Sequence, residues 1–171
     1  GVGTKLITCW GSPALGGVYK LTAVQDGGIW KPTIKASENI QKSPNPGLKE
    51  VWRIYDKRGK ASADVISEES ERLFDAESID LFHPVDFSKF RTVNKSKVSH
   101  CELLLQPIAD NGELHYQFPS LNEIREQRDK DIQKLDAGVL RLINPHVYHV
   151  SLTEKLFQTK RAMLQSIQLK A

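Results

Sequence analysis

The stretch Glu50-Val51-Trp52-Arg53-Ile54-Tyr55, followed by Asp56-Lys57-Arg58-Gly59 and then by residues 61–66, predicts a β-hairpin. Polar and apolar side chains alternate through the first six residues, which is the period-two pattern of a strand with one buried face. Ala63 and Val65 fall on one face of the second strand, and the glycine that ends the connection suits a tight turn. We therefore expect two antiparallel strands here.

Two more hairpins are predicted on either side of this one. Before it, β-rich residues 18–24 and 29–35 flank the turn sequence Asp26-Gly27-Gly28. Pro32 lacks a backbone donor, so its strand should be an edge strand or should be interrupted there. After it, Asp110-Asn111-Gly112 is a strong turn signal between two short apolar segments.

Two helices are predicted after the strands. Ser120 and Glu123 have the spacing of a capping box, in which a hydroxyl and a carboxylate satisfy free backbone donors, and Ser151 and Glu154 repeat that spacing. The apolar positions expected to face a core are Leu121, Ile124, Ile132 and Leu135 in the first helix and Leu152, Leu156, Met163, Leu164 and Ile167 in the second. The predicted fold class is α+β, with antiparallel hairpins over about residues 29–118 followed by two or more helices over about residues 120–169.

Composition and charge exclude several classes of protein. Hydrophobic residues make up 39% and charged residues 26%, and no apolar run approaches the ~20 residues that span a bilayer, so no membrane partner is expected. Cys9 and Cys101 are far apart and form no C-x-x-C pair, which suits a reducing cytoplasm, although a disulfide between them stays open. His146 and His149 form an i, i+3 pair without a nearby thiolate, so no metal site is predicted.

The best candidate for a nucleic-acid contact is the basic segment 89–97. It holds Lys89, Arg91, Lys95 and Lys97, with Phe87 and Phe90 close by. A soluble strand edge has the same composition, however, and the net charge of +3 comes from 24 basic and 21 acidic residues that are interspersed. We therefore expect no nucleic-acid partner.

The opening sequence Gly1-Val2-Gly3-Thr4-Lys5 has the composition of a loop that binds a phosphate. Glycine at positions 1 and 3 lets successive backbone N–H groups converge on an anion, and the hydroxyl of Thr4 adds a donor. An ordinary strand-terminal turn can carry the same Gly-x-Gly spacing. Because no methionine and no signal peptide begin the sequence, we expect this chain to be the C-terminal piece of a longer protein, cut inside a functional loop.

Several short segments occur in a family-specific order along the chain. They are Gly1-Val2-Gly3-Thr4, Pro13 to Leu21, Lys35 to Asn39 leading through Lys42, Pro46 to Lys49, Trp52-Arg53, Leu103 to Pro107, Pro119-Ser120-Leu121 and Asn144-Pro145-His146-x-Tyr148. Together they resemble the C-terminal part of nicotinate phosphoribosyltransferase, and the resemblance covers essentially the whole chain.

The resemblance implies a division of the chain. Residues 1–24 would be the end of the family's α/β barrel, with its phosphate-binding loop and exit strand, and residues 25–171 would be the C-terminal domain. Gly1, Gly3 and Thr4 match the loop that holds the 5′-phosphate of donor and product. No catalytic residue and no metal ligand is carried over, because the phosphorylated histidine of the family would lie before Gly1.

The resemblance also implies an activity for the full-length protein. Enzymes of this family make nicotinate mononucleotide from nicotinate and phosphoribosyl pyrophosphate with ATP hydrolysis in NAD biosynthesis. The reaction transfers a phosphoribosyl group, and the enzymes carry a ligase-type classification. ATP and Mg²⁺ are then the co-substrate and metal of the full enzyme, the missing N-terminal barrel is a partner, and a homodimer is allowed. The isolated fragment is predicted to be inactive. A non-enzymatic α+β protein-interaction module remains the alternative function.

Overall fold

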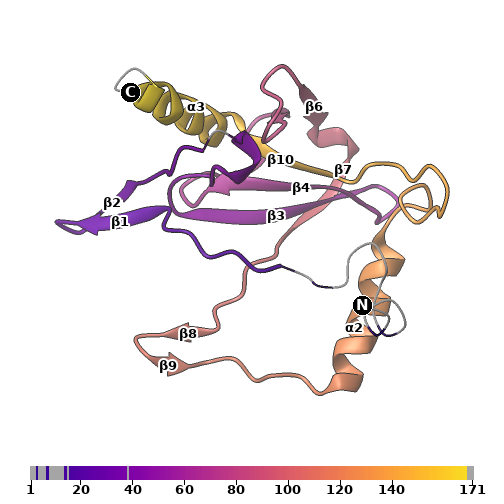
Figure 1. Ribbon diagram of the computed structural model, residues 1–171. Coiled ribbons are helices and arrows are strands. Elements are labelled where there is room, and N and C mark those ends of the chain that lie inside the picture. The colour runs from indigo at the N-terminus through magenta and orange to yellow at the C-terminus, as the bar shows by residue number, and fades with distance from the viewer. Residues whose placement is uncertain (1–2, 4–6, 8–13, 15, 38, 169–171) are drawn as a thin grey trace.

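The computed structural model describes residues 3, 7, 14, 16–37 and 39–168. In these residues the chain is mixed α+β, with one curled six-stranded sheet, two small hairpins and two helices (Figure 1). The strands are β1 (Ala23–Asp26), β2 (Ile29–Pro32), β3 (Lys49–Asp56), β4 (Ala61–Glu68), β5 (Ser78–Phe82), β6 (Phe90–Asn94), β7 (Val98–Leu103), β8 (Ala109–Asp110), β9 (Glu113–Leu114) and β10 (His149–Thr153). The helices are α2 (Leu121–Lys134) and α3 (Glu154–Gln168), with short 3-10 turns η1 (Ile40–Lys42) and η2 (Lys95–Lys97). Neither α2 nor α3 is long and apolar enough to cross a membrane.

The central hairpin is confirmed as β3 and β4, which pair antiparallel along most of their length. Its turn is held by Asp56, whose carboxylate accepts two backbone N–H groups of the connection at 2.8 and 3.0 Å. Gly59 has φ 72°, a left-handed conformation that glycine adopts without steric cost. The turn chemistry read from the sequence therefore sets the register of the two strands.

The two small hairpins are also confirmed, with shorter strands than predicted. Gly27 and Gly28 have φ values of 58° and 79° in the β1–β2 turn, and Asn111 and Gly112 have 49° and 83° in the β8–β9 turn. Strand β1 begins at residue 23 rather than near residue 18, and β2 ends at Pro32. Each hairpin is a separate two-stranded sheet, and no other strand among the described residues extends it.

The main sheet has the strand order β6-β5-β10-β4-β3-β7, with β10 parallel to β4 and antiparallel to β5. The predicted antiparallel hairpins are therefore accompanied by one parallel pair. The closing helix was expected to begin near Ser151 and to include Leu152, whereas residues 151–153 form the end of β10. Ser151, Leu152 and Thr153 are only 5%, 0% and 2% exposed, and burial between two strands outweighs the local helix-start pattern. Helix α3 begins at Glu154 instead. Its N-cap is Thr153, whose Oγ1 accepts the backbone N–H of Leu156 at 3.4 Å.

The sheet curls into a half-barrel. Its two edge strands, β6 and β7, are consecutive in the chain and are joined only by η2. Val93 of β6 and Val98 of β7 both pack against one cluster of buried residues, Ile54, Val65 and Leu81. We call the side of the sheet that carries this cluster the inner face. The curl lets both edges of the sheet share a single core.

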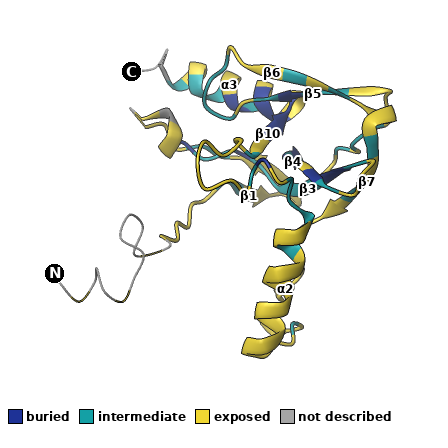
Figure 2. Cartoon of the chain, turned by 90° about the vertical axis from the view of Figure 1, so that its right-hand side faces the viewer, coloured by how far each residue is buried: buried dark blue, intermediate teal, exposed yellow. Residues whose placement is uncertain are grey.

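Helix α3 covers part of the opposite, outer face. Leu152, Leu156 and Phe157 form its buried cluster, against which Ile66 and Phe82 pack. The rings of Phe82 and Phe157 stack with their centroids 4.5 Å apart. Figure 2 shows the buried residues concentrated in the central strands and on the side of α3 that faces them.

Helix α2 contradicts the expected burial of its apolar residues. Leu121, Ile124 and Ile132 are 63%, 50% and 41% exposed, and no residue of α2 is buried. The helix stands apart from the sheet at the end of the β8–β9 arm (Figures 1 and 2). Only its C-terminal end reaches the sheet, where Leu135 forms a parallel bridge with Ala61. The apolar spacing correctly predicts a helix, but it does not show whether another part of the chain packs against the apolar side of that helix.

Replacing Ser120 by alanine is expected to weaken the first turn of α2 by about 0.5–2 kcal/mol. The predicted capping box is present, because the Ser120 hydroxyl accepts the N–H of Glu123 at 3.4 Å and the Glu123 carboxylate accepts the N–H of Ser120 at 2.7 Å. Since α2 buries nothing, we expect faster amide hydrogen exchange at residues 123–126 with little change in the global unfolding midpoint. Ser120→Asp, which keeps an acceptor, is the control. Unchanged exchange in Ser120→Ala would show that the cap contributes nothing.

Candidate functional site

The predicted phosphate loop is represented in the described part of the chain by one residue. Gly1 and Thr4 lie outside the described residues. Gly3 is exposed, and a Cβ added to it would meet no described heavy atom within 4 Å. The proposed role of these three residues therefore stays a prediction.

A polar network on the outer face joins two of the segments that carry the family resemblance. Asp64 of β4 accepts two hydrogen bonds from Arg53, at 2.8 and 3.0 Å, and a third from the Tyr148 hydroxyl at 2.8 Å. The hydrogen bond to Asp64 raises the pKa of the Arg53 guanidinium. Burial, followed by the same carboxylate, raises the pKa of the Tyr148 phenol. Arg53 is therefore held charged and Tyr148 neutral, which ties the loop before β10 to the β3–β4 hairpin.

A second network anchors the end of α2. The side chain of Tyr55 is 2% exposed, donates its hydroxyl to Glu102 Oε2 at 2.6 Å and stacks on the ring of His100. Burial is the largest cause of the raised pKa of this phenol. Lys134, at the end of α2, lies 5.8 Å from the centre of the Tyr55 ring and 3.8 Å from the Glu102 carboxylate. Charge and packing thus fix one end of an otherwise exposed helix.

An open groove of about 810 Å³ runs along α2 from its first turn to its C-terminal end. Ile124, Ile132 and Leu135, which were predicted to face a core, line it together with Tyr116 and Arg53. The lining combines apolar side chains with polar and charged ones, a composition typical of a surface that receives another chain segment. The groove contains no nucleophile paired with a base.

A basic pocket of about 390 Å³ is the second candidate. It lies where β5, β6 and β10 meet, and its walls include Arg91, His83, His149 and Lys89. The sequence showed Arg91 only as one member of a basic segment. The alternation of side chains along β6 could have distinguished Arg91 from the other cations of that segment. Arg91 and Val93 share a face of the strand, and Val93 packs on the core.

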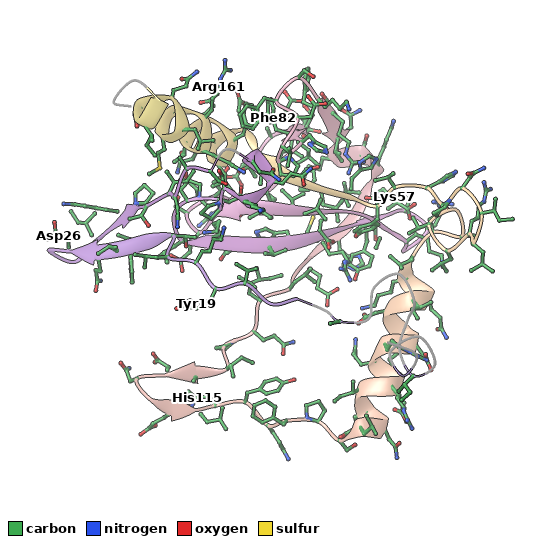
Figure 3. All side chains as sticks on the ribbon, viewed as in Figure 1. Tyr19, Asp26, Lys57, Phe82, His115 and Arg161 are labelled. Atoms are coloured by element: carbon green, nitrogen blue, oxygen red, sulfur yellow. The ribbon has the colours of Figure 1, made fainter. Side chains whose placement is uncertain are left out.

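The other histidines and Cys101 do not line either of these two pockets. The His146 ring lies so close to Gly138 that an added Cβ would be 2.3 Å from its Nδ1. His115 lies on the exposed β8–β9 arm, whereas Phe82 lies beside α3, where its ring stacks on that of Phe157 (Figure 3). Cys101 is a half-buried free thiol whose pKa is raised by burial, and Cys9 lies outside the described residues. No group of three or more metal-ligating side chains is found in the residues that were searched, which are the described ones.

Comparison with known proteins identifies relatives that match nearly the whole chain. Residues 48–160 match the family described as nicotinate phosphoribosyltransferase C-terminal domain. Nicotinate phosphoribosyltransferase of Bacillus subtilis is 35% identical over 170 residues, covering 98% of this chain, and that of Caenorhabditis elegans is 38% identical over 160 residues, covering 92%. The crystal structure of human nicotinic acid phosphoribosyltransferase superposes with a TM-score of 0.67 at 30% identity, covering 88% of this chain.

The fold is that of a domain that accompanies a phosphoribosyltransferase. The chain belongs to the nicotinate phosphoribosyltransferase family and corresponds to its C-terminal domain. It is much shorter than the relatives, since it spans 34% of the Bacillus subtilis protein, 27% of the Caenorhabditis elegans protein and 27% of the human structure.

Proposed function

We propose that this chain serves as the C-terminal part of an enzyme that makes nicotinate mononucleotide from nicotinate and phosphoribosyl pyrophosphate, coupled to ATP hydrolysis, in the cytoplasm. The observation that carries the proposal is the match of nearly the whole chain to nicotinate phosphoribosyltransferases at up to 38% identity. The chain contributes no catalytic side chain in this proposal. The described residues do not offer a fit for the Mg²⁺ that accompanies ATP, so no step is assigned to a metal here.

The proposed contribution to substrate binding is the loop of Gly1, Gly3 and Thr4. In this assignment residues 1–24 complete the barrel and their backbone N–H groups hold the 5′-phosphate of the donor. The transfer develops positive charge on the ribose as pyrophosphate leaves and the pyridine nitrogen attacks. Fixing the distant phosphate lowers the barrier by holding the anomeric carbon in line with that nitrogen.

The remaining domain, residues 25–171, is proposed to pack against the barrel and to support a subunit contact. The apolar side of α2 supports this, because Leu121 and Ile124 are at least half exposed in a helix whose other face is charged. The segment before β10 adds Leu142 and Ile143 at 101% and 81% exposure. Surfaces of this kind generally mark contacts with other protein elements.

The test replaces the matching last third of the Bacillus subtilis relative with this chain. We expect the chimera to form nicotinate mononucleotide, whereas the 171-residue chain and the truncated relative do not. In the chimera Gly3→Val should lower kcat/KM for phosphoribosyl pyrophosphate more than about tenfold, or ~1.4 kcal/mol, because a branched side chain occupies the space beside the phosphate. Thr4→Val, which deletes one donor, should cost about 0.5–3 kcal/mol.

Two results would contradict the proposal. A folded chimera with no more activity than the truncated relative would remove the enzymatic assignment. An active chimera in which both variants keep unchanged donor kinetics would leave the enzyme but remove the phosphate role of residues 1–4. Lys57→Ala, at an exposed position in the β3–β4 turn, is the control for the effect of substitution itself.

A further inference from the structure

The basic pocket between β5, β6 and β10 has more positive charge than its surroundings neutralise. It opens on the inner side of the curled sheet, where Leu81 of β5 pairs with Arg91 of β6 and His149 begins β10. Its volume of about 390 Å³ is within the range of small-molecule sites. Leu81 and Phe90 supply apolar walls.

Arg91 is the permanent charge of this pocket. Its Nε and Nη2 are shielded from solvent and have no hydrogen-bond partner among the described residues. Burial lowers the pKa of Arg91, and the nearby phenol of Tyr148 opposes this shift. Arg53 in the same sheet shows the usual arrangement, because its Nε and Nη2 both bind the Asp64 carboxylate. A partly buried arginine without such a partner costs free energy, because its charge has lost water and has no counter-charge. An anion that binds in the pocket supplies the missing counter-charge and offsets that cost.

Two histidines add donors to the same cavity. Nδ1 of His83 accepts the backbone N–H groups of Val85 and Asp86, at 3.2 and 2.8 Å, which leaves Nε2 of the neutral ring to carry a proton. The pKa of His149 is lowered first by burial and then by repulsion from Arg91 and from the protonated form of His83, which line the same pocket. An anion among them would reverse that repulsion.

One cation in the wall of the pocket, Lys89, is already paired with a carboxylate, that of Asp86. Asp86 binds Lys89 at 2.9 Å and also accepts the hydroxyl and N–H of Ser88. Those contacts lower the pKa of its carboxyl, with the Ser88 hydroxyl as the largest cause. Asp86 therefore compensates Lys89 and leaves the charge of Arg91 unmatched.

We propose that this pocket binds the phosphate group of a small phosphorylated molecule, with Arg91, His83 and His149 as the groups that hold it. A phosphate is favoured over a carboxylate because its higher charge and larger number of oxygens match one guanidinium and two imidazoles arranged around a common space. The site shares no residue with the loop of Gly1 to Thr4, and it does not depend on the proposed enzymatic activity.

The experiment measures binding of inorganic phosphate to the 171-residue chain by calorimetry and follows the ring signals of His83 and His149 by NMR. We expect saturable binding that shifts both ring signals and raises the thermal unfolding midpoint. Arg91→Met should weaken binding at least tenfold and should remove the rise in midpoint. In phosphate-free buffer Arg91→Met should be no less stable than the original chain, because it removes an uncompensated charge. His149→Gln is the second variant and should weaken binding to a smaller degree.

Matched controls identify the site. Arg125→Met removes an exposed arginine of α2 and should leave phosphate binding unchanged. The proposal is overturned if phosphate does not bind, if Arg91→Met binds as well as the original chain, or if Thr4→Val rather than Arg91→Met abolishes binding. Acetate is the competing anion. If acetate binds as tightly as phosphate, the pocket is a carboxylate site and the assignment of phosphate is wrong.

Discussion

Leu152→Ala is expected to destabilise the chain by about 2–5 kcal/mol, the largest stability loss we predict for a single substitution. Leu152 is 0% exposed and lies in β10, between β4 and β5, where it packs on Leu156 and Phe157 of α3. The substitution removes apolar side-chain surface that is buried on folding and leaves a cavity beneath the helix. The close-packed neighbours can fill this cavity only in part.

Urea unfolding followed by far-ultraviolet circular dichroism measures this loss. The matched control is Leu142→Ala, the same chemical change at a side chain that is 101% exposed, and it should shift the unfolding free energy by less than about 0.5 kcal/mol. Equal effects of the two substitutions would mean that β10 and α3 do not form the core described here.

Asp64→Ala is expected to cost about 1.5–3 kcal/mol, because it removes three hydrogen bonds to one carboxylate and leaves Arg53 without a counter-charge. The side chains of Arg53 and Asp64 are 20% and 13% exposed, so water replaces the lost partner poorly. Tyr148→Phe removes only the third bond and should cost less. Within a double-mutant cycle, the two substitutions should show a coupling of about 0.5–3 kcal/mol.

The control for this cycle is Lys31→Ala. Lys31 forms an ion pair with Asp26, but their side chains are 61% and 68% exposed, so the pair should contribute at most about 1 kcal/mol. A coupling near zero between Asp64 and Tyr148 would show that the loop before β10 is held by something other than this carboxylate.

The parts of the fold that local chemistry determines could be predicted from the sequence. Gly27 and Gly28, and likewise Asn111 and Gly112, adopt the left-handed conformations that their residue types favour, so the turns fall where expected. The cap of α2 at Ser120 is equally local, since donor and acceptor lie three residues apart. In each case the physical cause acts within one turn of the chain.

The predictions from the sequence were wrong where residues distant in the chain determine the local structure or the burial of a side chain. Ser151 to Thr153 carry a helix-start pattern, but strands some distance earlier in the sequence bury them on both sides as β10. Leu121 and Ile124 have the correct helical spacing for a core, yet the chain does not fold back to cover them. Arg91 could be counted as a cation, but only the pairing of β6 with β5 turns it toward the inner face and into the pocket with His149.

The position of β10 has a consequence for the order of folding. The pairs β3–β4 and β5–β6 are each formed by neighbouring segments. Within the described part of the chain, strand β10 is what joins one pair to the other in the sheet. Pairing β10 with β4 closes a long loop of chain. The conformational entropy of that loop is lost before the contacts of β10 with β4 and β5 can offset the cost. Formation of this strand should therefore limit the folding rate, and substitutions in β10 should slow refolding more than equally destabilising substitutions in the β1–β2 hairpin.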